Sequence, residues 1–304
     1  MNFYEWFFLE KGRSGDALFS WPHLLSVTVT LAIFFGLAVF LGKKFKNDPK
    51  KQTITLLVAG IAIVLVQIAK ITYLAWDTDN FWDCIIGNAP LYLCDMAIFI
   101  IPLAAVTRGR FRDWCLDFVS IWGILMAIFG TYLAGNIYPA HAAISWGAIN
   151  SLLNHAISGF AGLFIFVSGM NKMRKKDIPF SVSILLVFMF TALIIDYTHN
   201  LEHGGHNFMF FRHGDGTPFT FFKDYLSFNS QAVYVIWIFI LQCGYMVGFY
   251  FAYYGICKLI KRIKEKKQLE AAPVEEAQPV ETPVVEEETK KDAEEAPLEE
   301  QQEE

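Results

Sequence analysis

The sequence has little charge and lacks a cysteine motif. Asp, Glu, Lys and Arg make up 18% of its 304 residues, against 54% hydrophobic and 16% aromatic residues. The five cysteines are scattered without CxxC spacing, so no structural zinc site is indicated. The opening stretch, MNFYEWFFLEKGR, lacks the basic start of a cleavable signal peptide. This composition is typical of a membrane protein.

The sequence contains several long apolar runs. Each run is 17 to 25 residues long, and a helix needs about 20 residues to cross a hydrocarbon core ~30 Å thick. Backbone polar groups in lipid must bond internally, which favours helices. We therefore predict an all-α fold, a bundle of seven transmembrane helices. The segments are about 21–41, 54–76, 90–106, 116–134, 148–167, 178–195 and 232–256.

Basic residues predict the orientation of the bundle. The stretches after the first, third, fifth and seventh segments hold 18 Lys and Arg residues, against Lys11, Arg13, Arg212 and Lys223 on the other side. Cytoplasmic loops carry the excess of Lys and Arg, so we expect the N-terminus outside and the C-terminus in the cytoplasm of a multi-pass protein of the cell membrane.

Three regions follow from these patterns. We predict an extracytoplasmic segment over 1–20, a seven-helix domain over 21–257, and a basic juxtamembrane stretch with an acidic tail over 258–304. From Glu270 onward the chain has 14 acidic residues and two lysines, and its Glu/Pro/Val/Ala composition cannot form a core. We expect this tail to be disordered.

Polar side chains are predicted at one depth in four segments. If 90–106 is helical, Cys94 lies about 6 Å below Pro90. The residues that share this outer half of the bilayer are Lys70, Cys94, Asp95, Asn154, His155 and Asp196. Ionisable groups in a span are costly unless they face a cavity or one another, so we expect a shared polar pocket. A thiol near an imidazole can ionise and act as a nucleophile, with the histidine as base and then acid.

Plainer interpretations of these residues stay open. Lys70 can extend to the outer interface, and Asp95 and Asp196 can sit at helix ends in water or pair with Lys70. A lone membrane cysteine is usually an inert small hydrophobe. A disulfide between Cys84 and Cys94 is a further alternative, and it would silence the thiol.

A second polar cluster lies in DYTHNLEHGGHNFMFFRHGDG, residues 196–216. Its candidate metal ligands are Asp196, His199, His203 and His206. Imidazoles and a carboxylate at this spacing can hold zinc or iron. The alternative is a hydrated loop with glycine turns.

Four motifs carry a resemblance to a known family. They are SWPHLL at the first span, APLYLCD at the third, NHAISG in the fifth and NFMFFRHGDGTPFTFF before the last. Over about residues 15–257 the chain resembles the YwaF-like integral membrane proteins, which are relatives of transmembrane protein 164. The resemblance implies an acyltransferase of membrane phospholipids, in which Cys94 takes the acyl chain as a thioester and His155 assists. Tyr92 stands where relatives often carry a histidine.

We thus predict a phospholipid acyltransferase or acyl hydrolase that uses Cys94 and His155. Its substrate-binding candidates are Lys70 for the lipid phosphate, Asn154 or Asn88 for the oxyanion, and in addition Asp95 and Tyr92. We expect no cofactor, a phospholipid and an acyl donor or acceptor lipid as partners, and no nucleic acid. The alternatives are a zinc-dependent lipid amidohydrolase resembling alkaline ceramidases, and a non-enzymatic transporter or receptor.

Overall fold

The computed structural model describes residues 2–76, 81–171, 173–198, 207–214 and 217–271. Every regular element within these residues is helical. The chain divides into two compact units, Met1–Ile256 and Cys257–Glu304. The description below concerns the first unit, except that the last helix continues into the second as far as Ala271.

Among the described residues, six helices are long and apolar enough to span a membrane. They are α2 (Trp21–Lys44), α3 (Pro49–Trp76), α6 (Gly109–Tyr132), α7 (Trp146–Ser168), α8 (Ile178–Thr198) and α10 (Gln231–Ala271). The predictions of an all-α fold and of a multi-pass membrane protein are confirmed. The helices run further than the apolar segments at several ends, because polar residues continue the helical hydrogen bonding where water is available.

The remaining elements are short. They are α1 (Phe3–Phe7), α4 (Phe81–Gly87), α5 (Ala97–Val106), α9 (Phe219–Tyr225) and the 3-10 turns η1 (Lys175–Asp177) and η2 (Phe208–Phe210). The predicted helix over 90–106 differs from the structure, since helical geometry begins only at Ala97. Residues 88–96 form turns, with Leu91 N donating to Ala89 O at 2.7 Å. A ten-residue helix is too short to cross a bilayer alone, and the depth expected for Cys94 from the helical rise does not apply.

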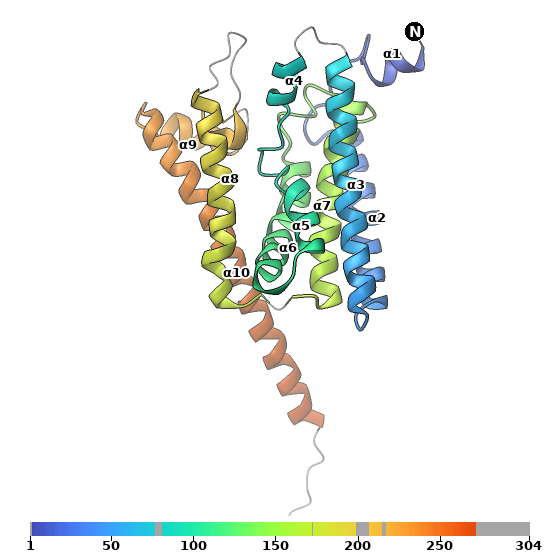
Figure 1. Cartoon of the computed structure of the whole chain (residues 1–304), viewed down its shortest axis with the longest axis vertical. Coiled ribbons are helices and arrows are strands. Elements are labelled where there is room, and N and C mark those ends of the chain that lie inside the picture. Colours follow the sequence, from blue (N-terminus) through green and yellow to red (C-terminus); the bar gives the residue numbers. More distant parts are fainter. Residues whose placement is uncertain (1, 77–80, 172, 199–206, 215–216, 272–304) are drawn as a thin grey trace, which may run out of the picture. The chain divides into compact units, whose positions relative to one another are not determined.

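Helix α7 is the most buried of the six long helices. It packs against α2, α3 and α6, while α5 packs between α3 and α6 (Figure 1). A Cβ atom on Gly123 of α6 would overlap the Ser158 carbonyl of α7. Glycine here therefore allows α6 and α7 to approach closely, as small residues do in membrane helix pairs. Ser145 caps the start of α7 by accepting from Ala148 N at 3.3 Å.

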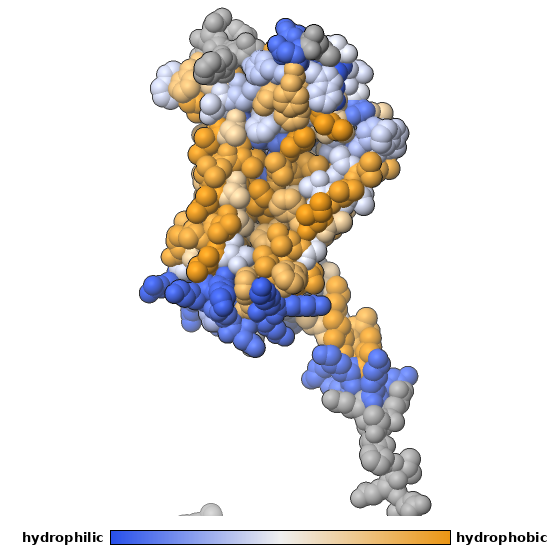
Figure 2. All heavy atoms as spheres, turned by 90° about the vertical axis from the view of Figure 1, so that its right-hand side faces the viewer, coloured by the Kyte–Doolittle hydropathy of each residue, from blue (hydrophilic) through white to orange (hydrophobic). Residues whose placement is uncertain are grey.

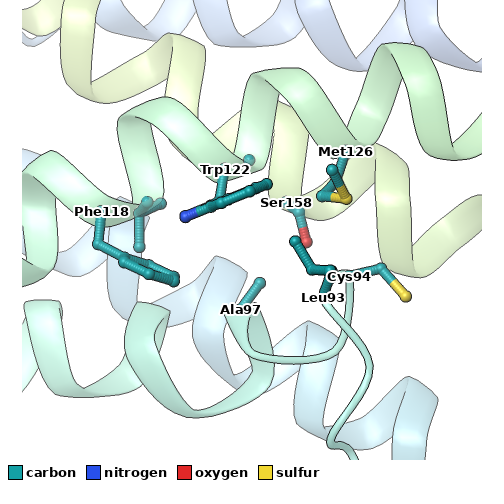
Figure 3. Close-up of a pocket in the computed structure, with 9 residues that line it drawn as sticks. Leu93, Cys94, Ala97, Phe118, Trp122, Met126 and Ser158 are labelled. Atoms are coloured by element: carbon teal, nitrogen blue, oxygen red, sulfur yellow. The ribbon is translucent and has the colours of Figure 1, made fainter. Parts of the chain in front are cut away.

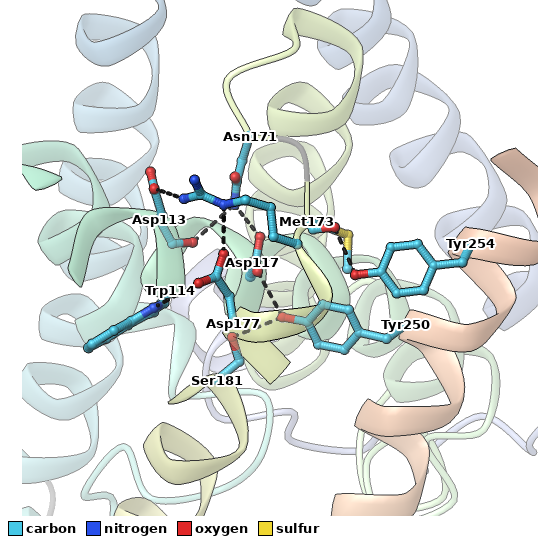
Figure 4. A network of polar contacts seen from close by, with 10 residues as sticks. Asp113, Trp114, Asp117, Asn171, Met173, Asp177, Ser181, Tyr250 and Tyr254 are labelled. Atoms are coloured by element: carbon cyan, nitrogen blue, oxygen red, sulfur yellow. Dashed lines mark hydrogen bonds and ion pairs between the residues drawn. The ribbon is translucent and has the colours of Figure 1, made fainter. Parts of the chain in front are cut away.

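A buried carboxylate in the first half of α6 joins three helices (Figure 4). Asp117 of α6 is fully buried, and its Oδ2 accepts a hydrogen bond of 2.9 Å from the Tyr250 hydroxyl of α10. The same hydroxyl lies 3.0 Å from Ser181 Oγ of α8. Asn171, just after α7, bonds to the other oxygen of Asp117. Buried polar groups are stable only when bonded, so this contact fixes α6, α8 and α10 against each other.

An ion-pair cluster borders that contact. Arg174 binds Asp177 through Nε at 2.9 Å and also pairs with Asp113 of α6. Asp177 is buried and accepts a further hydrogen bond of 3.3 Å from Trp114 Nε1. The loop after α7 is thereby bonded to the start of both α6 and α8. Sequence analysis did not single out Asp113, Asp117 or Asp177.

The surface has the banding of a membrane protein. Figure 2 shows a broad hydrophobic zone that ends at a strongly hydrophilic rim. Large apolar side chains are exposed along α2 and α3, among them Ile33, Leu37, Val58, Ile61 and Leu65. Exposed apolar area of this extent is suited to contact with lipid.

Candidate functional site

The turns over residues 88–96 lie inside the bundle. Leu91, Leu93, Asp95 and Met96 are buried. Helix α3 holds the start of the segment, because Gln67 Nε2 donates to the backbone carbonyl of residue 88 at 2.8 Å. Non-helical backbone at membrane depth is tolerated where protein covers it or where it lines a cavity. Residues 88–96 therefore do not form part of a transmembrane helix and are covered by the surrounding helices.

A chain of hydrogen bonds runs from Cys94 to the central helix. Cys94 Sγ donates to Asp95 Oδ1 at 3.5 Å. The same oxygen accepts a 2.6 Å bond from Asn154 Nδ2 of α7. Ser158 Oγ, one turn further along α7, donates to the Asn154 carbonyl at 2.8 Å. Thiol, carboxylate and amide thus form one connected polar group between the turn segment and α7.

Lys70 of α3 is close enough to interact electrostatically with both Cys94 and Asp95. It is half-buried, and Asp95 is nearly inaccessible. A cation beside a buried carboxylate reduces the cost of keeping that carboxylate charged. The structure therefore brings together Lys70, Asp95 and Asn154 around the Cys94 thiol.

His155 occupies a closely fitted site between α7 and α6. Its ring is buried, and the Met126 backbone of α6 is one of its close electrostatic neighbours. A Cβ atom on Gly130 would overlap the ring carbon Cε1. A glycine at position 130 is therefore required for the imidazole to lie where it does. Sequence analysis did not identify Gly130, whose role depends on a neighbour on another helix.

A small cavity lies beside the thiol (Figure 3). Its lining residues are Leu93, Cys94, Ala97, Phe118, Val119, Trp122, Gly123, Met126 and Ser158. Its volume is about 10 Å³, which is at most the space of one water molecule. Figure 3 shows the Cys94 sulfur pointing away from the Phe118 and Trp122 end. Any group larger than a water molecule can therefore enter only if the surrounding side chains move apart.

Three buried polar atoms around this site have no hydrogen-bond partner among the described residues. They are Trp122 Nε1, Asn154 Oδ1 and His155 Nδ1. An unsatisfied buried polar group costs about 1–3 kcal/mol, so such groups usually have a functional reason or bind water or a ligand. Trp122 lines the cavity with Cys94, and Asn154 belongs to the hydrogen-bond chain. A bound water molecule or a polar ligand group could form hydrogen bonds with these three atoms.

The structure places one common residue, Met126 of α6, beside both Cys94 and His155. No hydrogen bond joins the thiol to the imidazole in the described part of the chain. Met126 borders both, since it lines the cavity beside Cys94 and its backbone faces the His155 ring. The group in direct contact with the thiol is the Asp95 carboxylate. The direct Cys94–His155 contact stays a prediction.

The other substrate-binding candidates lie near the ends of the turn segment. Asn88 Nδ2 donates to the Cys84 carbonyl at 3.0 Å, so that its amide closes the end of α4. The Tyr92 ring packs edge-on against Phe208 of η2, with centroids 5.3 Å apart. All five cysteines are free thiols, which includes Cys84 and Cys94.

The histidine cluster falls mostly outside the described residues. The described residues do not include His199, His203 and His206. Asp196 is described and buried, and its Oδ1 accepts a 2.9 Å bond from Phe208 N. The zinc site stays a prediction.

A family comparison matches most of the chain. The model of the TMEM164 family matches residues 18–253. The chain belongs to the TMEM164 family. Searches among curated proteins and among solved structures match nothing. The predicted relationship to transmembrane protein 164 is confirmed, and the matched range contains every candidate site residue named above.

Proposed function

We propose that this member of the TMEM164 family is a membrane-embedded phospholipid acyltransferase with Cys94 as its nucleophile. The observation that carries the proposal is the Cys94 thiol on a non-helical segment inside the bundle, bonded to Asp95 and bordered by unpaired polar atoms. An inert cysteine needs neither an irregular backbone nor a carboxylate partner.

The proposed reaction has two balanced steps. The thiol loses its proton to His155, and the sulfur attacks the ester carbonyl carbon of a phospholipid. The ester C–O bond breaks, the leaving alkoxide takes the proton back, and a thioester on Cys94 remains. In the second step a lysophospholipid hydroxyl gives its proton to His155 and attacks the thioester, which forms a new ester and restores the thiol. Water in place of that hydroxyl gives hydrolysis.

Neighbouring residues are assigned supporting roles. The Asn154 amide is the candidate donor to the oxyanion, because its Nδ2 already bonds to the carboxylate that contacts the thiol. Lys70 is assigned to the lipid phosphate. Asp95 positions the thiol, and Tyr92 and Asn88 hold the turn segment in place. We assign the reaction to the cell membrane, with no cofactor in either step.

The test is a single-turnover assay of the purified chain in lipid nanodiscs. A phospholipid with an isotopically labelled acyl chain is supplied, and the intact mass of the protein is measured before and after hydroxylamine. We expect a hydroxylamine-sensitive acyl adduct on the wild-type protein and none on Cys94→Ala. His155→Gln should slow acyl transfer by about 10²–10⁴-fold.

Cys243→Ala is the matched control, because Cys243 is a half-buried free thiol on α10 that lies outside the site. It should form the adduct at the wild-type rate. Unchanged transfer by Cys94→Ala, or equal loss in both cysteine variants, contradicts the proposal.

A further inference from the structure

A basic cleft lies at the rim of the bundle, at the opposite end of α5 from Cys94. It is formed by the first turns of α3, the end of α5 and the first turn of α6. Its lining residues are Lys50, Thr53, Ile54, Ala105, Val106, Thr107, Arg108 and Arg112. Its volume is about 340 Å³, many times that of the cavity beside Cys94. This space is large enough for a small polar group with part of a hydrocarbon chain.

The charge in the basic cleft is uncompensated. Lys50, Arg108 and Arg112 contribute three cations. In the part of the chain that the structure describes, no carboxylate lies within ion-pair distance of any of them. Asp48, the neighbouring acid, is paired with Lys51 at 2.9 Å. Three unpaired cations around one cleft favour an anionic ligand.

The backbone adds to this preference. Helix α6 begins at the cleft, at Gly109, whereas the start of α3 at Pro49 is already capped, because Lys51 N donates to Asp48 Oδ1 at 3.0 Å. Arg108 is the N-cap residue of α6 and makes no side-chain capping bond, so the first amides of that helix keep unused donors. Free N–H groups and the positive end of the helix dipole are suited to phosphate oxygens.

Arg112 is held in place before any ligand arrives. Its Nε donates to the Ala104 carbonyl at 3.1 Å, and its Nη2 donates to Thr53 Oγ1 at 2.9 Å. These bonds connect α6 to the end of α5 and to α3. A guanidinium fixed in this way loses little conformational entropy on binding.

One wall of the basic cleft is apolar and continues into the lipid-facing surface. Ile54 and Val106 line the cleft and are both about half or more exposed, at 49% and 63%. Exposed Val58 and Leu103 extend the same wall along α3 and α5. Figure 2 shows a hydrophilic rim meeting the hydrophobic zone on this molecule. A soluble anion would contact only the charged residues of the cleft, whereas a lipid would contact the charged residues and the apolar wall.

We propose that the basic cleft binds the phosphate of an anionic phospholipid, with an acyl chain along Ile54, Val58 and Leu103. Arg112 and Lys50 contact the phosphate oxygens, and Arg108 lies at the outer edge. The inference is independent of the acyl-transfer chemistry, because none of these residues contacts the Cys94 site.

The test is native mass spectrometry of the full chain released from detergent, titrated with phosphatidylglycerol or with phosphatidylcholine of the same acyl composition. We expect retention of about one phosphatidylglycerol per chain and at least tenfold weaker retention of phosphatidylcholine. The double variant Lys50→Gln/Arg108→Gln should weaken phosphatidylglycerol binding by about tenfold or more. Both residues are exposed and make no side-chain bond within the described structure, so the variant is expected to fold. Arg112 is left intact because it connects three helices.

The matched control is Lys43→Gln/Arg110→Gln. It removes the same charge from exposed positions that do not line the cleft. It should bind phosphatidylglycerol within twofold of the wild type. Equal weakening in both double variants, or unchanged binding in the cleft variant, overturns the proposal.

Soluble glycerol 3-phosphate is added as a competitor to separate a lipid headgroup from a free phosphate. We expect it to displace the lipid only at concentrations at least a hundredfold higher than those of the lipid. Displacement at comparable concentrations would assign the cleft to a soluble phosphate compound and would refute the lipid proposal.

Discussion

At the scale of single residues, the site depends on contacts between side chains on different helices. Asp95 and Asn154 are 59 positions apart in the sequence and share a 2.6 Å hydrogen bond. Composition and helical periodicity identified both as polar groups at membrane depth, because polar residues stand out in apolar runs. They did not identify Trp122, Met126 or Gly130, because an aromatic, a thioether and a glycine are ordinary in a span.

Gly130→Ala tests the fit of His155. The added methyl group would overlap the imidazole, so the ring must move or the helices must separate. We expect a destabilisation of about 1–3 kcal/mol, seen as a lower Tm in detergent, together with slower acyl transfer.

Gly36→Ala is the control for this substitution. A Cβ at Gly36 of α2 has open space around it, so alanine there should leave Tm unchanged or raise it slightly. If Gly130→Ala matches the wild type in both Tm and acyl transfer, the close fit of His155 has no functional meaning.

At the scale of elements, sequence analysis located six long helices and misassigned one. The apolar runs marked the helices because a span must bury its backbone bonds and expose hydrocarbon. Residues 90–106 have the same composition, yet they form turns followed by α5. Hydropathy reports how apolar a segment is, and a segment covered by protein needs no continuous helix. The turns therefore could not be read from composition.

The N-terminal segment is bonded to the connection between α6 and α7. Glu10 accepts a 2.8 Å bond from His141 Nδ1 and a 3.1 Å bond from Ala142 N. Asp16 accepts from Ala143 N at 2.6 Å, and Arg13 donates to the Ile144 carbonyl at 2.8 Å. Although partial burial acts to raise the pKa of Glu10, these hydrogen bonds hold it below its usual value of 4.5.

Glu10→Gln tests this connection through its pH dependence. A carboxylate whose folded pKa is lowered stabilises the fold above its unfolded pKa, and that contribution is lost as the pH falls through the folded pKa. The Tm of the wild type should exceed that of Glu10→Gln at pH 7 and pH 5, and the difference should shrink below about pH 4.5.

The matched control for this change is Asp224→Asn, at an exposed position. Its Tm difference from the wild type should stay near zero at every pH. A Tm difference for Glu10→Gln that is constant from pH 7 to pH 3.5 would mean that the carboxylate charge does not hold the segment.

At the scale of the whole bundle, the last helices share the main hydrophobic core and add a few polar contacts to it. Tyr250 of α10 reaches Asp117 of α6 and Ser181 of α8 in one contact. Nearer the start of α10, Gln242 Nε2 donates to the Met209 carbonyl at 3.2 Å and Trp237 Nε1 donates to the Leu226 carbonyl at 3.0 Å. Loss of one such contact should therefore weaken the packing of several helices and lower the stability of the fold.

Tyr250→Phe removes the hydroxyl and keeps the ring. It leaves one oxygen of the buried Asp117 without its partner, and we expect a loss of about 1–3 kcal/mol and a Tm lower by several degrees. Tyr245→Phe on the same helix is the control, because Tyr245 is 53% exposed, and its Tm should be unchanged. Equal Tm values for the two variants would show that the Asp117 contact does not join the helices.

The turns before α5 have a mechanical consequence. In a continuous transmembrane helix, displacing one residue breaks backbone hydrogen bonds of the helical ladder, and lipid cannot replace them. Around Cys94 that ladder is incomplete, because the helix begins at Ala97 and the preceding turn is closed only by Asp95 N and Met96 N, which both donate to the Tyr92 carbonyl. The backbone beside the small cavity can therefore shift with fewer hydrogen bonds broken than in a continuous helix, and such a shift would widen that cavity.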